Sequence, residues 1–141
     1  MSRPVHVPAI DPRSVPAPSR EIFAHMGEAN ITRMIADLYV ELEASPIRAM
    51  FGADMAQGAT RSAAFFTGLL GGPPLYAERY GNPMMRARHM PFAIDLRARA
   101  VWLACFERVL AHAADYSFPE EHLAGFRAFL EGFSHWMVNT A

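Results

Sequence analysis

Apolar residues recur every three or four positions along four segments of this chain, which is the period of an α-helix that buries one face. The segments cover about 30–45, 55–70, 95–114 and 117–137. None of them shows the alternation of apolar and polar residues that is typical of a half-buried strand. With 141 residues the chain has room for one hydrophobic core and not for two comfortable domains. The pattern therefore predicts a single all-α domain.

Residues that favour helix ends support these boundaries. Asn30 is a suitable N-cap for the first segment, because its side-chain oxygen can accept a backbone N–H of the first turn. The run Gly71–Pro74 stops the second segment, and Asp95 is a suitable cap for the third. Ser117 and Glu120 have the spacing of a capping box before the fourth. We therefore expect four main helices with breaks at these positions.

The charge balance and the N-terminus exclude some classes of partner. There are 13 basic and 14 acidic residues, and no basic cluster of the kind that nucleic-acid binding requires. No apolar run approaches the roughly 20 residues that span a bilayer. The first 20 residues hold five prolines and lack the apolar segment of a secretory signal. We expect no nucleic-acid or membrane partner, a cytoplasmic location and a disordered tail over residues 1–20.

Between the second and third segments lies a stretch without a clear helical period. Residues 71–94 contain several glycines and prolines and only one short possible helix, at about 84–90. Irregular segments of this length are uncommon inside compact domains and usually carry function. This one holds His89, which is flanked by apolar residues and arginines.

His89 is a candidate ligand for a haem iron on chemical grounds, since neutral imidazole binds iron through one ring nitrogen. A haem also needs an apolar floor, and cations near its two carboxylates. The neighbours offer both, with a floor from Met85, Phe92 and Ile94 and cations from Arg86 and Arg88. The alternative is an exposed loop histidine beside two solvated arginines. On composition alone that alternative is the more common one.

Two blocks of this segment, Gly71–Gly81 and Arg86–Phe92, resemble the signature of the group II truncated haemoglobins. The resemblance extends over the chain outside the proline-rich tail. It implies a truncated globin domain over residues 21–141, folded as a two-over-two helical sandwich around one haem b. It also implies that His89 is the protein ligand of the iron.

The same resemblance assigns roles on the other side of the haem. Tyr39 matches the tyrosine that hydrogen-bonds the bound gas in this family, and Trp102 matches a characteristic tryptophan of the next long helix. Two aromatic residues, Phe51 and Phe65, are assigned to pack against the porphyrin. Two small residues, Gly58 and Ser62, are assigned to positions near the bound gas. From the residues alone, an aromatic core residue is the favoured interpretation of Tyr39. A solvent-facing serine fits Ser62 as well as a distal one.

The resemblance implies reversible binding of oxygen and other diatomic gases at ferrous haem, with oxygen transport as one use of it. Two other functions would employ the same residues. One is a haem enzyme that removes nitric oxide or peroxide with electrons from a separate reductase. The other is a gas sensor that acts through a partner protein. Either a monomer or a homodimer is expected.

Overall fold

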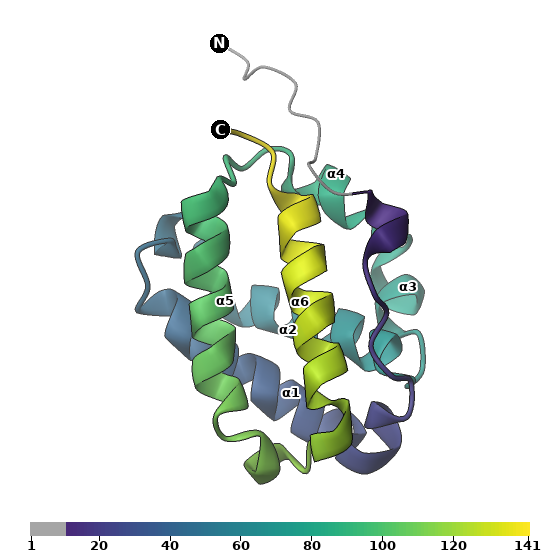
Figure 1. Ribbon diagram of the computed structural model, residues 1–141. Helices are drawn as coiled ribbons and strands as arrows, with labels where there is room; N and C mark the ends of the chain where they lie inside the picture. The colour runs from purple at the N-terminus through teal and green to yellow at the C-terminus, as the bar shows by residue number, and fades with distance from the viewer. Residues whose placement is uncertain (1–10) are drawn as a thin grey trace.

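The computed structural model describes residues 11–141, and every regular element within that range is helical (Figure 1). The six α-helices are α1 (Ile22–Glu43), α2 (Met55–Leu69), α3 (Leu75–Tyr80), α4 (Met85–His89), α5 (Leu96–Leu110) and α6 (Leu123–Met137). The all-α prediction is confirmed for this part of the chain. Within the same residues, no helix combines the length and the apolar character needed to cross a membrane.

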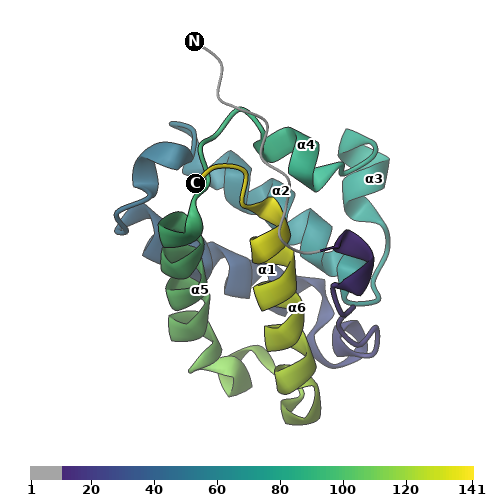
Figure 2. The same cartoon turned by 45° about the horizontal axis from the view of Figure 1, so that its top comes forward.

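The four long helices form two pairs. Figures 1 and 2 show α5 and α6 side by side in front of α1 and α2. Three aromatic rings join the pairs at the centre of the core, Phe66 from α2, Phe106 from α5 and Phe126 from α6. Their centroids lie 5.7 to 6.1 Å apart with steeply inclined planes. Such edge-to-face pairs add about 0.5–1.5 kcal/mol each beyond the area that they bury.

The first helix begins earlier than the sequence predicted. α1 starts at Ile22 and is interrupted at Gly27, whose φ of 73° and ψ of 165° are not helical. Asn30 is therefore not an N-cap, and its Nδ2 donates to the carbonyl of Met26 at 3.0 Å. Ile22 and Met26 are both buried in the core. Their burial extends the helical segment beyond the polar residue that we interpreted as its start.

The other helix starts agree with the sequence in part. Asp95 caps α5 as predicted, its Oδ1 accepting the N–H of Ala98 at 2.8 Å. The capping box before the last helix is wrong, because Ser117 adopts a left-handed conformation with φ of 57°. α6 begins only at Leu123, after a 3-10 turn over Glu120–His122. The short helix α3 was not predicted.

The glycine pair after α2 allows another segment to pack closely against it. Gly71 has φ of 106°, and a Cβ built there would overlap the carbonyl oxygen of Arg20. A Cβ on Gly72 would stand 2.6 Å from the Phe23 ring. The N–H of Phe23 also donates to the carbonyl of Leu70 at 2.9 Å. The two glycines therefore do more than stop α2, since they let the start of α1 lie against its end.

Part of the stretch 11–20, which the sequence placed in a disordered tail, contacts the helices in the structure. A 3-10 turn over Pro12–Ser14 contacts α6. Val15 lies against Gly132 of α6, and Pro18 is buried. The apolar side chains of this stretch explain the difference, because they cover core surface at α6. The first ten residues of the predicted tail lie outside the described part of the chain.

We predict that Gly71→Ala destabilises the fold strongly. A positive φ costs a residue with a Cβ about 1–2 kcal/mol, and the overlap with the Arg20 carbonyl adds to that cost. The matched control is Gly125→Ala in α6, where a Cβ meets nothing within 4 Å. There alanine is expected to stabilise by up to about 1 kcal/mol. Urea unfolding of both variants measures the two effects, and equal stabilities would contradict this account of the turn.

Candidate functional site

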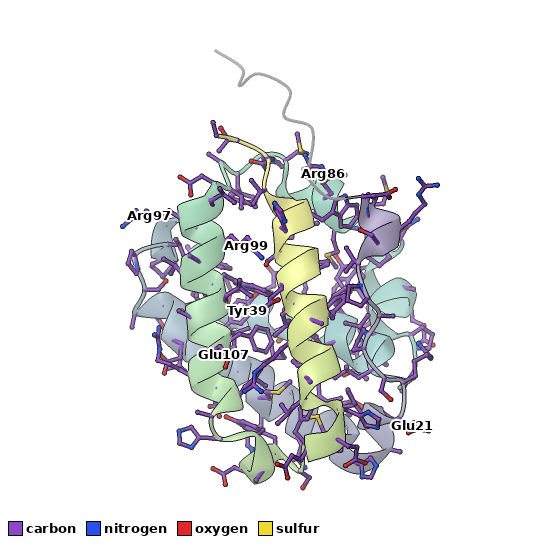
Figure 3. The ribbon with its side chains drawn as sticks, in the orientation of Figure 1. Glu21, Tyr39, Arg86, Arg97, Arg99 and Glu107 are labelled. Atoms are coloured by element: carbon purple, nitrogen blue, oxygen red, sulfur yellow. The ribbon has the colours of Figure 1, made fainter. Side chains whose placement is uncertain are left out.

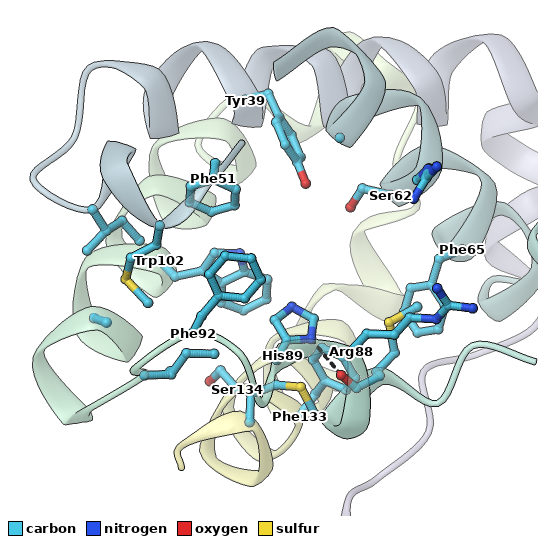
Figure 4. Close-up of a pocket in the computed structure, with 18 of the residues that line it drawn as sticks. Tyr39, Phe51, Ser62, Phe65, Arg88, His89, Phe92, Trp102, Phe133 and Ser134 are labelled. Carbon is cyan, nitrogen blue, oxygen red and sulfur yellow. Dashed lines mark hydrogen bonds between the residues drawn. The ribbon is translucent and has the colours of Figure 1, made fainter. Parts of the chain in front are cut away.

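A cavity of about 390 Å³ lies between the helix pairs, with α4 at one side (Figure 4). Its lining comes from all four long helices and from the segment between α4 and α5. Eleven of the twelve residues that the sequence assigned to a site line this one cavity: Tyr39, Phe51, Gly58, Ser62, Phe65, Met85, Arg88, His89, Phe92, Ile94 and Trp102. The exception is Arg86.

His89 stands at the end of α4 and its ring projects into the cavity (Figure 4). The Nδ1 atom lies 2.6 Å from the carbonyl oxygen of Met85, one helical turn earlier. A carbonyl oxygen can only accept, so Nδ1 must carry the proton of this hydrogen bond. In the neutral ring that leaves Nε2 as the atom with a free lone pair. The helix itself therefore selects the tautomer that a metal ligand needs.

Tyr39, Gly58 and Ser62 meet on the wall opposite His89 (Figure 4). A Cβ on Gly58 would stand 3.0 Å from Cε2 of Tyr39, so the glycine leaves room for the phenol ring. The edge of that ring also packs against Phe51, with centroids 5.8 Å apart. Ser62 faces the cavity on the same wall, with its hydroxyl turned toward the space beside the Tyr39 hydroxyl (Figure 4). The sequence left open whether Tyr39 is a core residue and whether Ser62 faces solvent, and in the structure both side chains line the cavity.

Burial raises the pKa of the Tyr39 phenol above its ordinary value of 10.0, and the hydrogen bond to Ser62 opposes this shift in part. Removal from water penalises the charged phenolate more than the neutral phenol. A raised pKa means that the hydroxyl keeps its proton throughout the neutral range. Tyr39 can therefore donate a hydrogen bond into the cavity.

Aromatic and apolar side chains form the remaining walls. Trp102 of α5 lies in the cavity lining and packs at a steep angle on Phe106, with centroids 5.3 Å apart. Phe65 of α2 lies against Phe133 of α6, with centroids 5.8 Å apart. Phe92 is partly exposed at the rim, where 41% of its surface remains accessible. These walls suit a flat, largely apolar ligand.

Arginines from three elements line the cavity. Arg88 donates from Nε to the carbonyl of Pro83 at 2.6 Å and lies over the ring of Tyr76. Arg99 donates from Nε to Oγ of Ser134 at 3.1 Å, and Arg61 lies over the ring of Tyr80. Carbonyls, hydroxyls and aromatic rings leave the charge of a guanidinium unneutralised. The cavity lining therefore carries positive charge that can attract the anionic groups of a ligand.

Arg86 is the one assigned residue that is absent from the cavity lining, and its role beside a haem carboxylate stays a prediction. Its Nη1 donates to the carbonyls of Trp136 and Val138, the latter at 2.9 Å. Figure 3 shows Arg86 close to α4 and the end of α6, whereas Arg99 lies between α5 and α6. The last carbonyls of a helix lack partners within the helix and attract donors. These hydrogen bonds connect Arg86 of α4 to the end of α6.

Sequence reasoning missed half of the lining. The missed residues are Ile47, Met50, Gly52, Arg61, Phe66, Tyr76, Ala98, Arg99, Phe133, Ser134 and Met137. Helical spacing contained a usable signal for several of them, because Arg61 lies four residues before Phe65 and Ala98 lies four before Trp102. Phe133 and Met137 share the apolar stripe of α6 in the same way. The sequence shows the apolar stripe of α6, but it does not show that part of this stripe lines a cavity, because that depends on how the helices pack.

Comparison with known proteins gives consistent results. Residues 21–139 match the model of a family described as bacterial-like globin. The group 2 truncated hemoglobin YjbI of Bacillus subtilis is 35% identical over 115 residues, which are 81% of this chain and 85% of that protein. Among solved structures, phosphate-bound Hell's gate globin IV aligns with a TM-score of 0.83 and 31% identity over 99% of this chain and 86% of that one. A truncated oxygen-avid haemoglobin from Bacillus subtilis aligns with a TM-score of 0.75 and 30% identity over 83% and 98%.

We predict that Tyr39 ionises above its ordinary value of 10.0. Spectrophotometric titration of the phenolate band in the wild type and in Tyr39→Phe should differ by one tyrosine, and the missing step should lie above pH 10. The control is Tyr116→Phe, which should remove a separate step, because burial and the hydrogen bond to Asp37 raise the pKa of Tyr116 to about 12. A Tyr39 step at or below pH 10 would show that its hydroxyl is open to water.

Proposed function

The chain belongs to the bacterial-like globin family and resembles the group II truncated haemoglobins over most of its length. From this premise we propose that the protein binds haem b through His89 and uses the haem to bind oxygen reversibly. The family implies haem-based binding of diatomic gases. The observation that carries the finer proposal is the placement of His89. Its Nε2 lone pair is free, and its ring projects into a cavity whose opposite wall presents the Tyr39 hydroxyl.

The residues around the cavity fit a haem. The imidazole supplies one neutral nitrogen, and aromatic and aliphatic side chains supply a dry surface for the porphyrin. Arg88, Arg99 and Arg61 supply cations for the two carboxylates of the macrocycle, and guanidinium groups bind carboxylates well. Haem, when bound, supplies a ferrous iron that binds oxygen and related diatomic gases reversibly.

Two side chains distinguish this cavity from a purely apolar one. The Tyr39 hydroxyl stays protonated, so it can donate to a ligand that carries partial negative charge. Trp102 belongs to the same lining, and its indole N–H can only donate. Both donors favour a polarised ligand such as oxygen over a less polar one such as carbon monoxide.

The composition of the lining favours gas binding over peroxide reduction. Within the described residues, the cavity lining includes no carboxylate, and His89 is its single histidine. General acid–base catalysis on peroxide needs a group that gains and loses a proton near neutral pH on the ligand side. Tyr39 does not supply one, because its pKa is raised. Nitric oxide removal and sensing would each require a partner protein, and reversible oxygen binding is the function that this chain's own residues support.

We predict that His89→Gly loses most of its haem. The substitution removes the proposed protein ligand of the iron, whereas loss of an exposed histidine should be near neutral. His112→Gly is the control, because the side chain of His112 is 70% exposed and lies outside the cavity. Haem content and the visible spectrum measure the difference, and added imidazole should restore a bound spectrum in His89→Gly. Wild-type protein that stays colourless when haem is supplied, or unchanged haem content in His89→Gly, would refute the proposal.

We also predict that Tyr39→Phe speeds oxygen release. One hydrogen bond contributes on the order of 1 kcal/mol, so the oxygen dissociation rate should rise about fivefold or more. Carbon monoxide binding should change less, because that ligand is less polar. Trp102→Phe deletes the second donor, and the double variant should show non-additive rates if both donors serve one ligand. Equal changes for both gases in Tyr39→Phe would mean that the tyrosine acts through packing or access.

A further inference from the structure

The helix that carries His89 is poorly supported from within. α4 has five residues, none of them buried, and no side chain caps its start. It begins after Met84, whose φ of 41° is left-handed and unfavourable for a residue with a Cβ. A single helical turn in water is unstable by itself. The position of His89 must therefore depend on contacts from elsewhere in the chain.

Those contacts come from Asn139, just beyond the end of α6. Its Nδ2 donates to the carbonyl oxygens of His89 at 3.1 Å and Phe92 at 2.9 Å. Its Oδ1 accepts the N–H of Ile94 at 2.9 Å, and its own backbone N–H donates to the Ile94 carbonyl at 2.9 Å. The amide thus uses both of its donors and its acceptor on one six-residue stretch.

Burial makes these bonds consequential. Asn139 is 2% exposed, although asparagine is mostly found at the surface. Loss of a buried partner leaves backbone groups unsatisfied, which costs more than an exposed hydrogen bond contributes. Arg86 adds a second connection in the same place, from α4 to the carbonyls of Trp136 and Val138. Figures 1 and 2 both show the C-terminal segment beside the loop that leads from α4 to α5.

We infer that Asn139 is a positioning residue for His89. It holds the carbonyl of His89 and the following loop, so that the imidazole keeps its direction into the cavity. The inference rests on the proposed function, since it concerns the residue proposed to bind iron. Asn139 does not line the cavity. Its effect passes through the backbone of residues 89–94.

A set of three variants separates positioning from simple stability. Asn139→Ala removes the three side-chain hydrogen bonds to residues 89–94. Asn139→Asp keeps the size and the acceptor for Ile94 but removes both donors to the carbonyls. Val138→Ala is the matched control, because Val138 is buried next to Asn139 and its truncation loosens the same segment without touching these bonds.

The first measurement follows haem loss and the iron–histidine stretching band in the ferrous protein. Outer partners of a metal ligand typically contribute about 10- to 100-fold to metal affinity. Both Asn139 variants should lose haem faster by about that factor and should shift or broaden the iron–histidine band. Val138→Ala should keep the wild-type band, even if its unfolding midpoint falls as much as the midpoints of the Asn139 variants. An unchanged band in both Asn139 variants, or the same shift in Val138→Ala, would overturn the inference.

The second measurement uses the protein without haem, so it does not depend on the proposed function. The imidazole NMR signals of His89 should change in both Asn139 variants and not in Val138→Ala. Exchange of the Ile94 amide should accelerate in Asn139→Ala alone, because aspartate retains the acceptor. If Asn139→Ala does not fold, Asn139→Asp decides the question. Wild-type protein that takes up no haem refutes the proposed function, and the NMR comparison then decides the role of Asn139 by itself.

Discussion

A histidine that must point into a cavity stands here on a helix of five residues, and a helix that short has no stability of its own in water. The rest of the site depends on how this weakness is compensated. Inside the turn, the Met85 carbonyl accepts a hydrogen bond from the Nδ1–H of His89, which leaves Nε2 as the free ring nitrogen. Outside it, Asn139 and Arg86 connect the turn to the end of α6. The last helix therefore forms part of the cavity wall and also supports α4, which lies against it.

The two sides of the cavity are built on different physical terms. On the His89 side, hydrogen bonds from Asn139 to backbone groups hold a short helix and the segment after it in one place. On the Tyr39 side, the elements are long helices, and steric fit decides the arrangement. Gly58 leaves the space that the Tyr39 ring fills, and burial keeps the phenol neutral. A wall of long helices with a neutral donor therefore faces the Nε2 atom of His89 on the short helix α4. This arrangement suits a ligand that binds the His89 nitrogen on one side and accepts a hydrogen bond from Tyr39 on the other.

The distribution of charge supports the same interpretation, although the net charge hides it. Overall the chain carries a formal charge of −1. Residues 82–99 nevertheless hold four arginines and one carboxylate, that of Asp95, which caps α5. Arg88 and Arg99 donate hydrogen bonds to neutral groups, which do not neutralise the charge of the guanidinium. A local excess of positive charge at a cavity rim attracts anionic groups of a ligand, whatever the total charge of the protein.

The sequence by itself determined the features that depend on a few neighbouring residues. Apolar spacing located α2, the Asp95 cap located the start of α5, and the Gly–Pro-rich stretch with its recognisable blocks singled out His89. Tertiary structure decided what depends on residues far apart in the chain. It connected Arg86 to the end of α6, placed Arg99 in the cavity lining, and set Asn139 against His89, 50 residues away in the sequence. The physical reason is that periodicity and capping are local properties, whereas a hydrogen bond between distant residues exists only after the helices have packed.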